Sequence, residues 1–410
     1  MSQDKTILVV GTYDTKDDEL NYMRDCIRGQ GGNVLSMDIS VMGDPSEPTD
    51  YSKHAVAEEG GSSIQEAIDS GDENHAMQIM ARGGAMLALR LYREGKIDGV
   101  VVLGGTMGTD VALDICQALP LGVPKYVVST VSFSHLLPPE RLAADIQMIL
   151  WAGGLYGLNS VCKSSLSQAA GAVLGAARAV EKPAKDKPLI GMTSFGKTIL
   201  HYMVTLKPAL EVRGFEVAVF HATGMGGRAF ESLAAEGAFA CVMDFATQEV
   251  GNHLMGGLSA GADRLTNAGA TATPQIVAPA CYDLVDFVGW KPLPERMGDK
   301  PAHDHNRLLK SVVLDNDERR EVARTHAEKL ATAKGPTTFI MPKGGCNEWD
   351  RPNAPLHDAD GLAAFIDEIG NTMPANVDYR PLDCHINDAA FCETVLAIFD
   401  AWVADGTVKA

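Results

Sequence analysis

The chain has 410 residues, more than one compact core usually holds, so we expect two domains. Its formal charge of −18 argues against sequence-independent binding to nucleic acid or to an anionic membrane surface, because both need clustered lysine and arginine. No apolar run approaches the roughly 20 residues that cross a bilayer, and the first residues lead straight into a strand. We therefore expect a cytoplasmic protein without a signal peptide. Its eight scattered cysteines are expected to be reduced.

Four short, β-branched apolar runs predict strands in the first half: TILVVG, NVLSMDI, DGVVVLGG and KYVVSTV. Helical patterns lie between them at residues 17–30, 62–96 and 110–119. Fully apolar strands that alternate with helices are typical of a parallel sheet covered on both faces. The connection between the second and third strands is longer than one crossover needs, so we expect an additional helix or a helical flap there.

The charged, proline-bearing stretch EKPAKDKP predicts a linker at residues 181–187, between domains 1–180 and 188–410. Five more strand-and-turn units follow: PLIGMTSFG, EVAVFHATG, ACVMDFAT, PQIVAPAC and TTFIMPKGG. The predicted fold class is therefore α/β, with two Rossmann-like, doubly wound parallel-sheet domains. Such sheets bind ligands beyond the carboxyl ends of their strands, so the residues after each strand are the informative ones.

The first such turn lies in VVGTYDTKDDEL. The pattern from Thr15 to Asp18 matches a capping box, which predicts Thr15 as a helix N-cap. Carboxylates in the first helical turn would repel a phosphate, so we expect this turn to contact the base, the ribose or the metal side of a ligand. Lys16 is the one cation available to a phosphate there. A well-capped helix without a ligand is the alternative.

The second turn, LGGTMGTD, again joins a strand to a helix. Glycine removes the Cβ that would block an anion, and consecutive amides at a helix start converge on negative charge. We therefore expect phosphate at this turn, and a tight turn without a ligand is the alternative. Hydroxyls after the fourth strand reach the same sheet edge, at Ser129, Thr130 and Ser132.

A third stretch, GMTSFGKT at residues 191–198, satisfies the phosphate-loop pattern G-x-x-x-x-G-K-[ST]. A phosphate-loop NTPase centred on Lys197 and Thr198 is therefore an alternative, with Asp244 as a magnesium-binding residue at a strand end. Phe195 is bulky at a point where such a loop must wrap tightly.

Two clusters in the second half are candidates for chemistry. FHATGMGGRAFE places His221 at a strand end and Arg228 on the next helical turn, where arginine can grip a carboxylate or a phosphate. In LDCHIND, strand alternation would send Asp383, His385 and Asn387 to one face, as a general base with its partner or as part of a metal site. Helix capping by Asn387 or Asp388 is the alternative reading. The histidines of AHDHN, residues 302–306, are a weaker candidate, because surface loops often hold histidine.

Taken together, these stretches resemble the ATP-binding family named after the tomato mosaic virus resistance protein. The matching stretches are VVGTYDTKDDEL, VVLGGTMGTD, LPLGVPKYVVST, GLYGLNSV, PLIGMTSFG, VFHATGMGGRAFE, AGADRL and LDCHIND, in the same order over nearly the whole chain. The resemblance implies two Rossmann-like domains, a homodimer, and ATP with Mg²⁺ in the first domain. It also implies that GMTSFGKT is not the ATP site, and that the chain corresponds to the plant relatives without their additional barrel domain.

Carried over to this sequence, the resemblance implies an ATP site made by two turns. Its residues would be Gly11, Thr12, Asp14, Thr15, Lys16, Gly104, Gly105, Thr106, Gly108 and Thr109. Ser129 and Thr130 are expected beside them. The sequence assigns no metal ligands.

The resulting expectation is an ATP-binding protein with a second ligand site in the cleft between its domains. The second domain would present five residues to a small anionic metabolite: His221, Arg228, Glu249, His385 and Asp388. Phosphoryl transfer or ATP-dependent ligation would suit such a site, because positioning and charge neutralisation dominate both reactions. The alternatives are the phosphate-loop NTPase, a non-catalytic sensor whose dimer ATP stabilises, and metal-dependent hydrolysis or cleavage of a metabolite.

Overall fold

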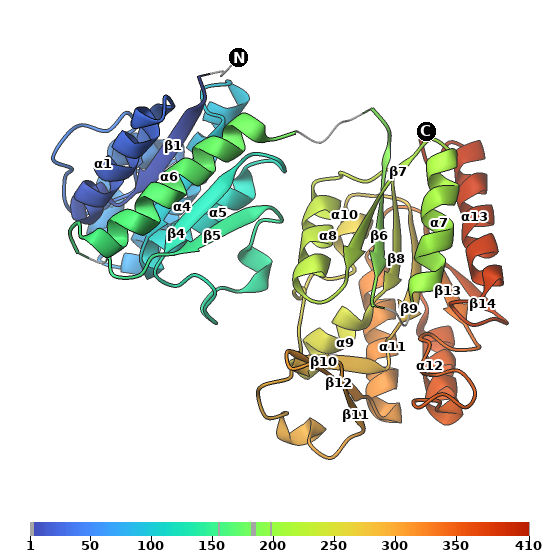
Figure 1. Ribbon diagram of the computed structural model, residues 1–410. Helices are drawn as coiled ribbons and strands as arrows, with labels where there is room; N and C mark the ends of the chain where they lie inside the picture. Colours follow the sequence, from blue (N-terminus) through green and yellow to red (C-terminus); the bar gives the residue numbers. More distant parts are fainter. Residues whose placement is uncertain (1–3, 155, 182–185, 197–198, 410) are drawn as a thin grey trace. The chain divides into compact units, whose positions relative to one another are not determined.

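The computed structural model describes residues 4–154, 156–181, 186–196 and 199–409. The chain divides into two compact units, Met1–Pro183 and Ala184–Ala410, which we call the N-terminal and the C-terminal unit. Each unit is a parallel sheet with helices on both faces (Figure 1). The predicted α/β fold class with two Rossmann-like sheets is therefore confirmed.

The N-terminal sheet has the strand order β2-β1-β3-β4-β5, and all neighbouring strands are parallel. Its strands are β1 (Thr6–Gly11), β2 (Asn33–Asp38), β3 (Gly99–Gly104), β4 (Lys125–Ser129) and β5 (Ile146–Leu150). Its helices are α1 (Tyr13–Gly29), α2 (Lys53–Glu59), α3 (Ile64–Asp69), α4 (Glu73–Arg93), α5 (Thr106–Ala118) and α6 (Ser160–Ala179). The strand order reverses between β1 and β3, which makes the gap between them the topological switch point.

The apolar strands of this unit serve two cores at once. In β1, Ile7 and Val9 belong to the core with α1 and α6, whereas Leu8 and Val10 belong to the core with α4 and α5. Successive side chains of a strand point to opposite faces, so burial on both faces requires an uninterrupted apolar run. This requirement explains why the strands β1 and β3 could be predicted from the sequence.

Two features of the N-terminal unit differ in detail from the sequence expectation. The edge strand β5 was not predicted, because its burial is only partial and its sequence, IQMIL, contains a polar residue. The long connection between β2 and β3 holds three helices, α2, α3 and α4, where one additional helix or a helical flap was expected.

The C-terminal sheet has the order β14-β13-β9-β8-β6-β7, again all parallel. Its strands are β6 (Leu189–Ser194), β7 (Glu216–His221), β8 (Cys241–Ala246), β9 (Gln275–Ala280), β13 (Thr337–Pro342) and β14 (Val377–Leu382). Its helices are α7 (Leu200–Val212), α8 (Met225–Ala235), α9 (Gln248–Met255), α10 (Asn267–Ala270), α11 (Asn316–Ala331), α12 (Ala359–Thr372) and α13 (Ala389–Ala404). Counted from its own first strand, this sheet repeats the order 2-1-3-4-5 of the N-terminal sheet and adds a sixth strand.

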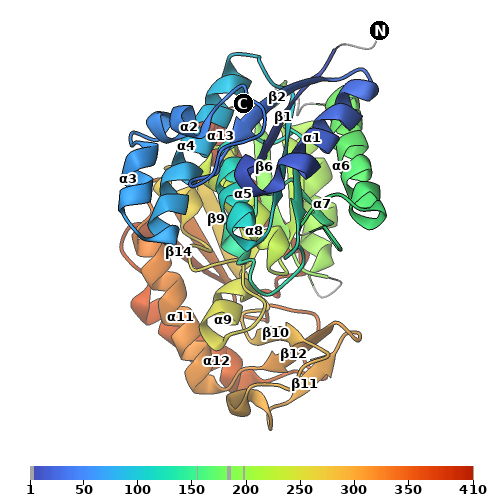
Figure 2. The same ribbon diagram turned by 90° about the vertical axis from the view of Figure 1, so that its left-hand side faces the viewer.

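A small antiparallel sheet is inserted between β9 and α11. It has the order β10-β12-β11, from β10 (Leu284–Val288), β11 (Ala302–Asp304) and β12 (Leu309–Val313). Figure 2 shows this sheet at one end of the C-terminal unit, beside α9. This inserted sheet was not predicted from the sequence.

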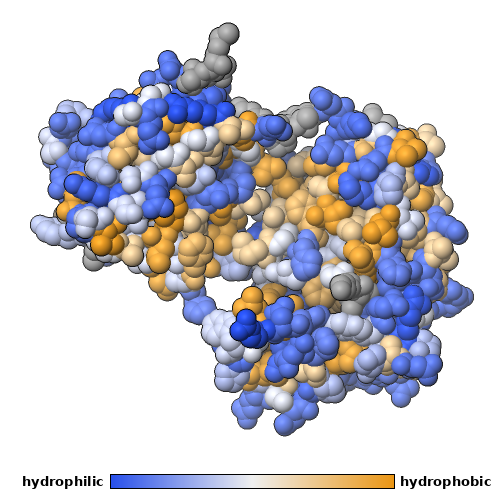
Figure 3. All heavy atoms as spheres, viewed as in Figure 1, coloured by the Kyte–Doolittle hydropathy of each residue, from blue (hydrophilic) through white to orange (hydrophobic). Residues whose placement is uncertain are grey.

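Polar and charged side chains cover much of the visible surface of both units (Figure 3). None of the helices in the described part of the chain combines the length and the apolar character that crossing a bilayer requires. None of the eight cysteines, all within the described part of the chain, forms a disulfide, and all but the half-buried Cys26 are buried.

Candidate functional site

The candidate site lies beyond the carboxyl ends of β1 and β3, at the switch point of the N-terminal sheet. Gly11 ends β1 and Gly104 ends β3, and the two strands are direct neighbours. The turns that follow them are the two turns that the sequence analysis selected. They are adjacent in space although about 90 residues separate them in the sequence.

Both turns line one pocket of about 710 Å³. This volume is within the range that small-molecule sites occupy. The pocket is lined by Thr12, Asp14, Thr15, Lys16, Ile39, Ser40, Val41, Met42, Ala67, Ile68, Gly71, Asp72, Glu73, Ala76, Met77, Gly105, Thr106, Met107 and Gly108. Most of its wall is apolar and comes from the end of β2 and from α3 and α4.

The start of α5 gives this pocket its anion-binding character. Gly105 is the N-cap residue and has no side chain to satisfy the first amides of the helix. The first intrahelical bond is the one from the Thr109 amide to the Gly105 carbonyl, at 2.9 Å. The amides that precede it have no carbonyl four residues back, so they remain available to a negatively charged group.

The glycines of this turn have different roles. A Cβ at Gly104 would lie 2.6 Å from Cα of Gly108, so Gly104 is required for the close packing of β3 against α5. A Cβ at Gly105 would meet nothing closer than Thr130 Oγ1 at 3.9 Å, so its side faces open space.

Thr109 and Ser129 support the turn from behind. Thr109 Oγ1 donates to the Gly105 carbonyl at 2.7 Å and lies 2.6 Å from Ser129 Oγ, and both residues are buried. Thr130 lies on a neighbouring pocket of about 560 Å³, together with Gly105 and Trp151. Thr106, Thr109 and Thr130 therefore line cavities, as do Thr12 and Thr15 of the other turn.

The turn after β1 is built differently from the predicted capping box. Helix α1 begins at Tyr13 with Thr12 as N-cap, and Lys16 interrupts it with non-helical dihedral angles (φ −128°, ψ 25°). Thr15 Oγ1 contacts Thr12 Oγ1 at 3.2 Å and does not cap a helix. The expectation that Thr15 caps a helix through Asp18 was wrong, because the chain makes one short turn before the main helix starts.

The charges on the pocket wall are mostly negative. Three carboxylates line the pocket, those of Asp14, Asp72 and Glu73, together with one cation, Lys16. The Nζ of Lys16 donates to the Thr15 carbonyl at 3.0 Å. Asp72 caps α4 by accepting from two amides, so its charge is partly neutralised. Asp14 Oδ2 accepts from the Gly43 amide at 3.3 Å, whereas its buried Oδ1 has no hydrogen-bond partner among the described residues.

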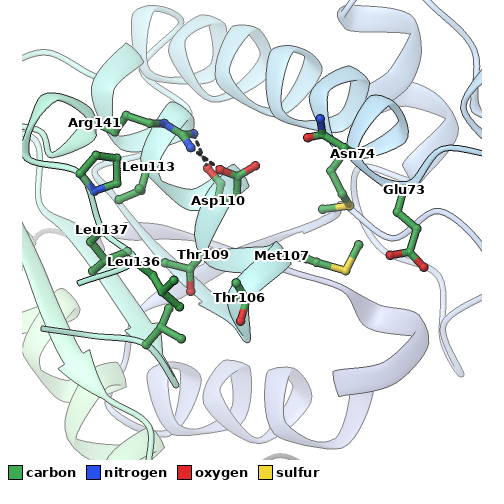
Figure 4. A pocket seen from close by; sticks show the side chains of 13 residues that line it. Glu73, Asn74, Thr106, Met107, Thr109, Asp110, Leu113, Leu136, Leu137 and Arg141 are labelled. Carbon is green, nitrogen blue, oxygen red and sulfur yellow. Dashed lines mark hydrogen bonds and ion pairs between the residues drawn. The ribbon is translucent and has the colours of Figure 1, made fainter. Parts of the chain in front are cut away.

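A smaller pocket of about 360 Å³ adjoins the first one across Thr106 and Met107 (Figure 4). Asp110 and Arg141 line it and form an ion pair, while Arg141 Nη2 also donates to Asp114 Oδ1 at 2.7 Å. Apolar side chains complete its wall: Met77, Leu113, Val131, Leu136, Leu137 and Pro138. The start of α5 therefore borders two cavities.

In the C-terminal unit, Glu249 lies in a buried ion pair, and the buried Arg228 pairs with a partly exposed carboxylate. The fully buried guanidinium of Arg264 contacts Glu249 at 2.7 Å, Asp244 at 2.5 Å and Glu231 at 3.0 Å. Burial raises the pKa of Glu249 to about 7, although Arg264 acts in the opposite direction. Arg228 pairs with Asp263 at 2.6 Å and is itself buried.

The structure places the other predicted residues of this unit as follows. His221 is exposed at the end of β7, and its Nδ1 lies 2.9 Å from Thr223 Oγ1. The expectation of a strand through LDCHIND was wrong, because β14 ends at Leu382 and a turn follows. Within that turn His385 Nε2 lies 3.0 Å from Asp350 Oδ1, and its Nδ1 accepts from the Asn387 amide at 3.0 Å.

Asp388 occupies the N-cap position of α13, one of the two positions that the capping alternative named. Its side chain makes no cap hydrogen bond, and its Oδ2 accepts from the His385 amide at 2.8 Å. Its other oxygen contacts Arg351 at 3.2 Å. The five predicted residues of the C-terminal unit therefore occupy three separate environments and do not form one constellation.

The phosphate-loop alternative rests partly on residues 197 and 198, which lie outside the described residues. Asp244, its proposed magnesium ligand, is buried and bonded to Arg264 and to Thr193 Oγ1 at 2.7 Å. Its carboxylate is thus already occupied by protein groups. Among the described residues, no group of three or more histidines, cysteines or carboxylates is arranged to hold a metal ion.

The apolar wall of the main pocket, which comes from residues 39–42 and from α3 and α4, was not predicted from the sequence. A signal for this segment was present in SGDENHAM, residues 70–77, where a glycine and two acids precede a helical pattern. The network around Arg264, which pairs residues distant in the sequence, was not predicted either.

Comparison with known sequences gives matches over the whole chain. The model of the uncharacterised protein family UPF0261, N-terminal domain, matches residues 5–182, and that of its C-terminal domain matches residues 187–403. A UPF0261 protein of Brucella melitensis biotype 1 is 52% identical over 403 residues, which cover 98% of this chain and 96% of that protein. A UPF0261 protein of Clostridium tetani is 34% identical over 94% of this chain and 96% of its own length.

A plant relative is more distant. The ToMV resistance protein Tm-1(GCR237) of Solanum lycopersicum is 26% identical over 97% of this chain and 56% of the tomato protein. Among solved structures, the S. aureus MnaA-UDP co-structure aligns over 67% of this chain and 79% of that chain, at 11% identity with a TM-score of 0.23. That score is too low to support an argument.

Proposed function

Because the chain belongs to the uncharacterised protein family UPF0261, whose name assigns no activity, we propose a function from the site itself: the N-terminal unit binds ATP with Mg²⁺. The family membership confirms the resemblance that the sequence motifs indicated. The proposal concerns the pocket between the turns after β1 and β3.

One observation carries this proposal. The two turns that sequence chemistry selected independently line a single pocket of about 710 Å³ at the switch point of a doubly wound sheet. Nucleotides bind at this position in such sheets, with their phosphates on a glycine-rich helix start.

The residues of the pocket fit the separate parts of a magnesium nucleotide. Val41, Met42, Ile68 and Met77 offer an apolar slot to a base, and the open amides at the start of α5 suit phosphate oxygens. Asp14 would hold the cation, because its buried Oδ1 lacks a partner among the described residues and Mg²⁺ prefers carboxylate oxygen.

The excess of carboxylates on the wall makes the cation necessary. A bare triphosphate would meet Asp14 and Glu73 with only Lys16 to offset them, whereas a bound Mg²⁺ neutralises part of both charges. The magnesium ion would supply this charge neutralisation and fix the position of the phosphates. We therefore expect nucleotide binding that depends strongly on the divalent cation.

We further propose that the bound nucleotide serves a reaction on a small metabolite, by phosphoryl transfer or ligation, or its detection. The 360 Å³ pocket on the other side of Thr106 and Met107 supports the presence of a second ligand close to the phosphates. A panel of metabolites assayed for ATP turnover separates the enzyme from the sensor: a sensor binds ATP tightly and shows no turnover with any of them.

Calorimetric titration with ATP, with and without Mg²⁺, tests the proposed site. Gly105→Val places a branched side chain at the open start of α5, and we expect it to abolish detectable binding. Gly175→Val is the matched control, because a Cβ at this exposed position of α6 has no neighbour within 4 Å. Binding that survives Gly105→Val but is lost in Lys197→Ala would assign the nucleotide to the phosphate-loop stretch instead.

A further inference from the structure

The small sheet of the C-terminal unit carries a chain of three hydrogen-bonding side chains. His305 Nε2 lies 3.0 Å from Ser311 Oγ, and Ser311 Oγ lies 2.5 Å from Asp286 Oδ1. Asp286 on β10 and Ser311 on β12 are direct partners in the antiparallel ladder, so the sheet itself fixes their contact. Both residues are fully buried, whereas His305, just after β11, is half-buried.

The order of these groups determines where the protons lie. A serine hydroxyl has one proton, and an ionised Asp286 can only accept it, so Ser311 donates to Asp286. Ser311 Oγ must then accept from His305, which requires the proton of a neutral imidazole to be on Nε2. The lone pair of the ring is therefore on Nδ1.

His305 is neutral and its Nδ1 is available. Burial and the neighbouring His303 lower the pKa of His305, which favours the uncharged ring at neutral pH. Among the described residues, none hydrogen-bonds to Nδ1. A neutral imidazole with one fixed N–H and one free lone pair is a hydrogen-bond acceptor and a base.

A contribution to stability does not explain why the carboxylate of Asp286 lies next to Ser311. Burial raises the pKa of Asp286 to about 6, and its Oδ2 is buried without a hydrogen-bond partner among the described residues. A buried carboxylate without a cationic partner costs stability. Asp286 does, however, fix the direction of the serine proton and hence the tautomer of His305.

Aromatic rings surround His305 at the edge of the larger sheet. Its ring centroid lies 5.1 Å from that of Trp349, which follows β13, and 6.4 Å from that of Phe195, which follows β6. The His303 ring lies 4.5 Å from Trp349. The carboxyl ends of β6 and β13 thus meet the inserted sheet at an aromatic surface of the kind on which planar molecules stack.

We propose that His305 is the proton acceptor of a second ligand site, and that Asp286 and Ser311 are the residues that position it. The ligand class is a planar aromatic or conjugated compound that presents an O–H group to Nδ1, with its flat body against Trp349. In the transfer step the ligand O–H bond breaks, its electron pair stays on the oxygen, and the proton forms a bond to Nδ1. The imidazolium keeps its Nε2–H bond to Ser311, whose hydroxyl remains bonded to Asp286.

This inference goes beyond the proposed function, because its evidence lies wholly within the C-terminal unit and its ligand differs from the one proposed beside Thr106 and Met107. The two proposals fail separately. Loss of the nucleotide site in Gly105→Val leaves the tautomer of His305 unchanged, and loss of the relay in Ser311→Ala leaves nucleotide binding unchanged.

The first test reads the tautomer by ¹⁵N NMR of the full chain labelled at histidine, with His305 assigned from His305→Gln. We expect an Nε2–H ring in the native protein and a mixture of tautomers in Ser311→Ala. Ser311→Thr keeps the hydroxyl and is expected to restore the native signal, which a merely structural serine would not do. An Nδ1–H ring in the native protein would overturn the proposal without any variant.

The second test compares phenol with anisole, which has the same planar body but no O–H group. We expect phenol to bind about fivefold more tightly, as one net hydrogen bond implies, and to shift the His305 Nδ1 signal. His305→Gln should remove this difference. His253→Gln is the matched control, because His253 also contacts a serine, Ser259 at 3.0 Å, but with no carboxylate in that contact.

Equal binding of phenol and anisole, or a difference that persists in His305→Gln, would overturn the ligand site. An unchanged preference for phenol in Ser311→Ala would show that the serine and the aspartate do not position the histidine.

Discussion

The two units share one strand order, but the switch point of the sheet is open in one unit and filled by side chains in the other. In the N-terminal unit the start of α5 is open and borders a pocket of about 710 Å³. In the C-terminal unit the edge beyond β8 is filled by Arg264 and three carboxylates, all buried. A shared topology therefore supplies a crevice, and the side chains placed there decide whether a ligand or the protein itself occupies it.

The largest expected effect tests whether the C-terminal edge is structural. Arg264→Met leaves Asp244, Glu231 and Glu249 buried without their cation, and we expect a loss of about 3–5 kcal/mol in the free energy of unfolding. Urea unfolding measures it. Arg213→Met is the control, because Arg213 pairs with Asp400 near the surface and its loss should cost less than about 1 kcal/mol. Similar losses in the two variants would remove the contrast between the units.

The next effect concerns pH. The pKa of Asp286 in the folded chain, about 6, lies above its ordinary value of 3.8. The contribution of its protonated form to the free energy of unfolding is therefore complete below pH 3.8 and is lost as the pH rises through 6. The native chain should therefore lose about 2 kcal/mol between pH 4 and pH 7 that Asp286→Asn does not lose. Urea unfolding of both chains across this range measures the difference. Parallel curves would contradict the assignment.

A smaller effect tests the packing of the N-terminal turn. Gly104→Ala places a Cβ 2.6 Å from the Gly108 backbone, and we expect about 2 kcal/mol of destabilisation together with weaker ATP binding. Gly105→Ala has open space and should stay within about 1 kcal/mol of the native chain. Thermal unfolding and calorimetry measure both properties. Equal effects would mean that the turn relaxes around either methyl group.

The smallest effect concerns the exposed cation of the pocket. Lys16→Met should weaken binding of magnesium ATP by about fivefold, because one solvated charge contributes little to affinity. Lys163→Met makes the same charge change on α6, outside the pocket, and should leave the affinity unchanged. A loss of more than about a hundredfold in Lys16→Met would make Lys16 the main phosphate ligand, in place of the helix start.

Features that neighbouring residues determine could be predicted from the sequence, whereas features that depend on contacts between distant residues could not. Strands β1 and β3 and their glycine turns were predictable, since burial on both faces demands continuous apolar runs and the turn residues follow directly. The half-exposed edge strand β5 and the inserted sheet lack that signal. The kink at Lys16 also escaped detection, because the local pattern around Thr15 favoured a capping box that the turn geometry does not use.

The candidate site was predictable only in part for a related reason. Its two glycine turns are local motifs, whereas its apolar wall comes from helices whose residues look like ordinary core. The pairing of Arg264 with Asp244 and Glu231 joins segments 20 and 33 residues apart, and no spacing rule marks it. The histidines of residues 302–306 were given little weight as a surface loop, because the serine and the aspartate that orient His305 become visible only when β10 and β12 pair.

The two ends of the inserted sheet lie side by side, and this arrangement has a consequence for exchanging the segment. Leu284, where the insertion begins, and Val313, where it ends, are ladder partners, and the Leu314 amide donates to the Asp283 carbonyl at 2.9 Å. The insertion therefore leaves and re-enters the parent fold at one junction. A chimera that exchanges the segment between these two positions keeps this single junction, but it must also preserve the hydrogen bond from the Asp286 amide to Asn252 and the ion pair of Lys300 with Glu318.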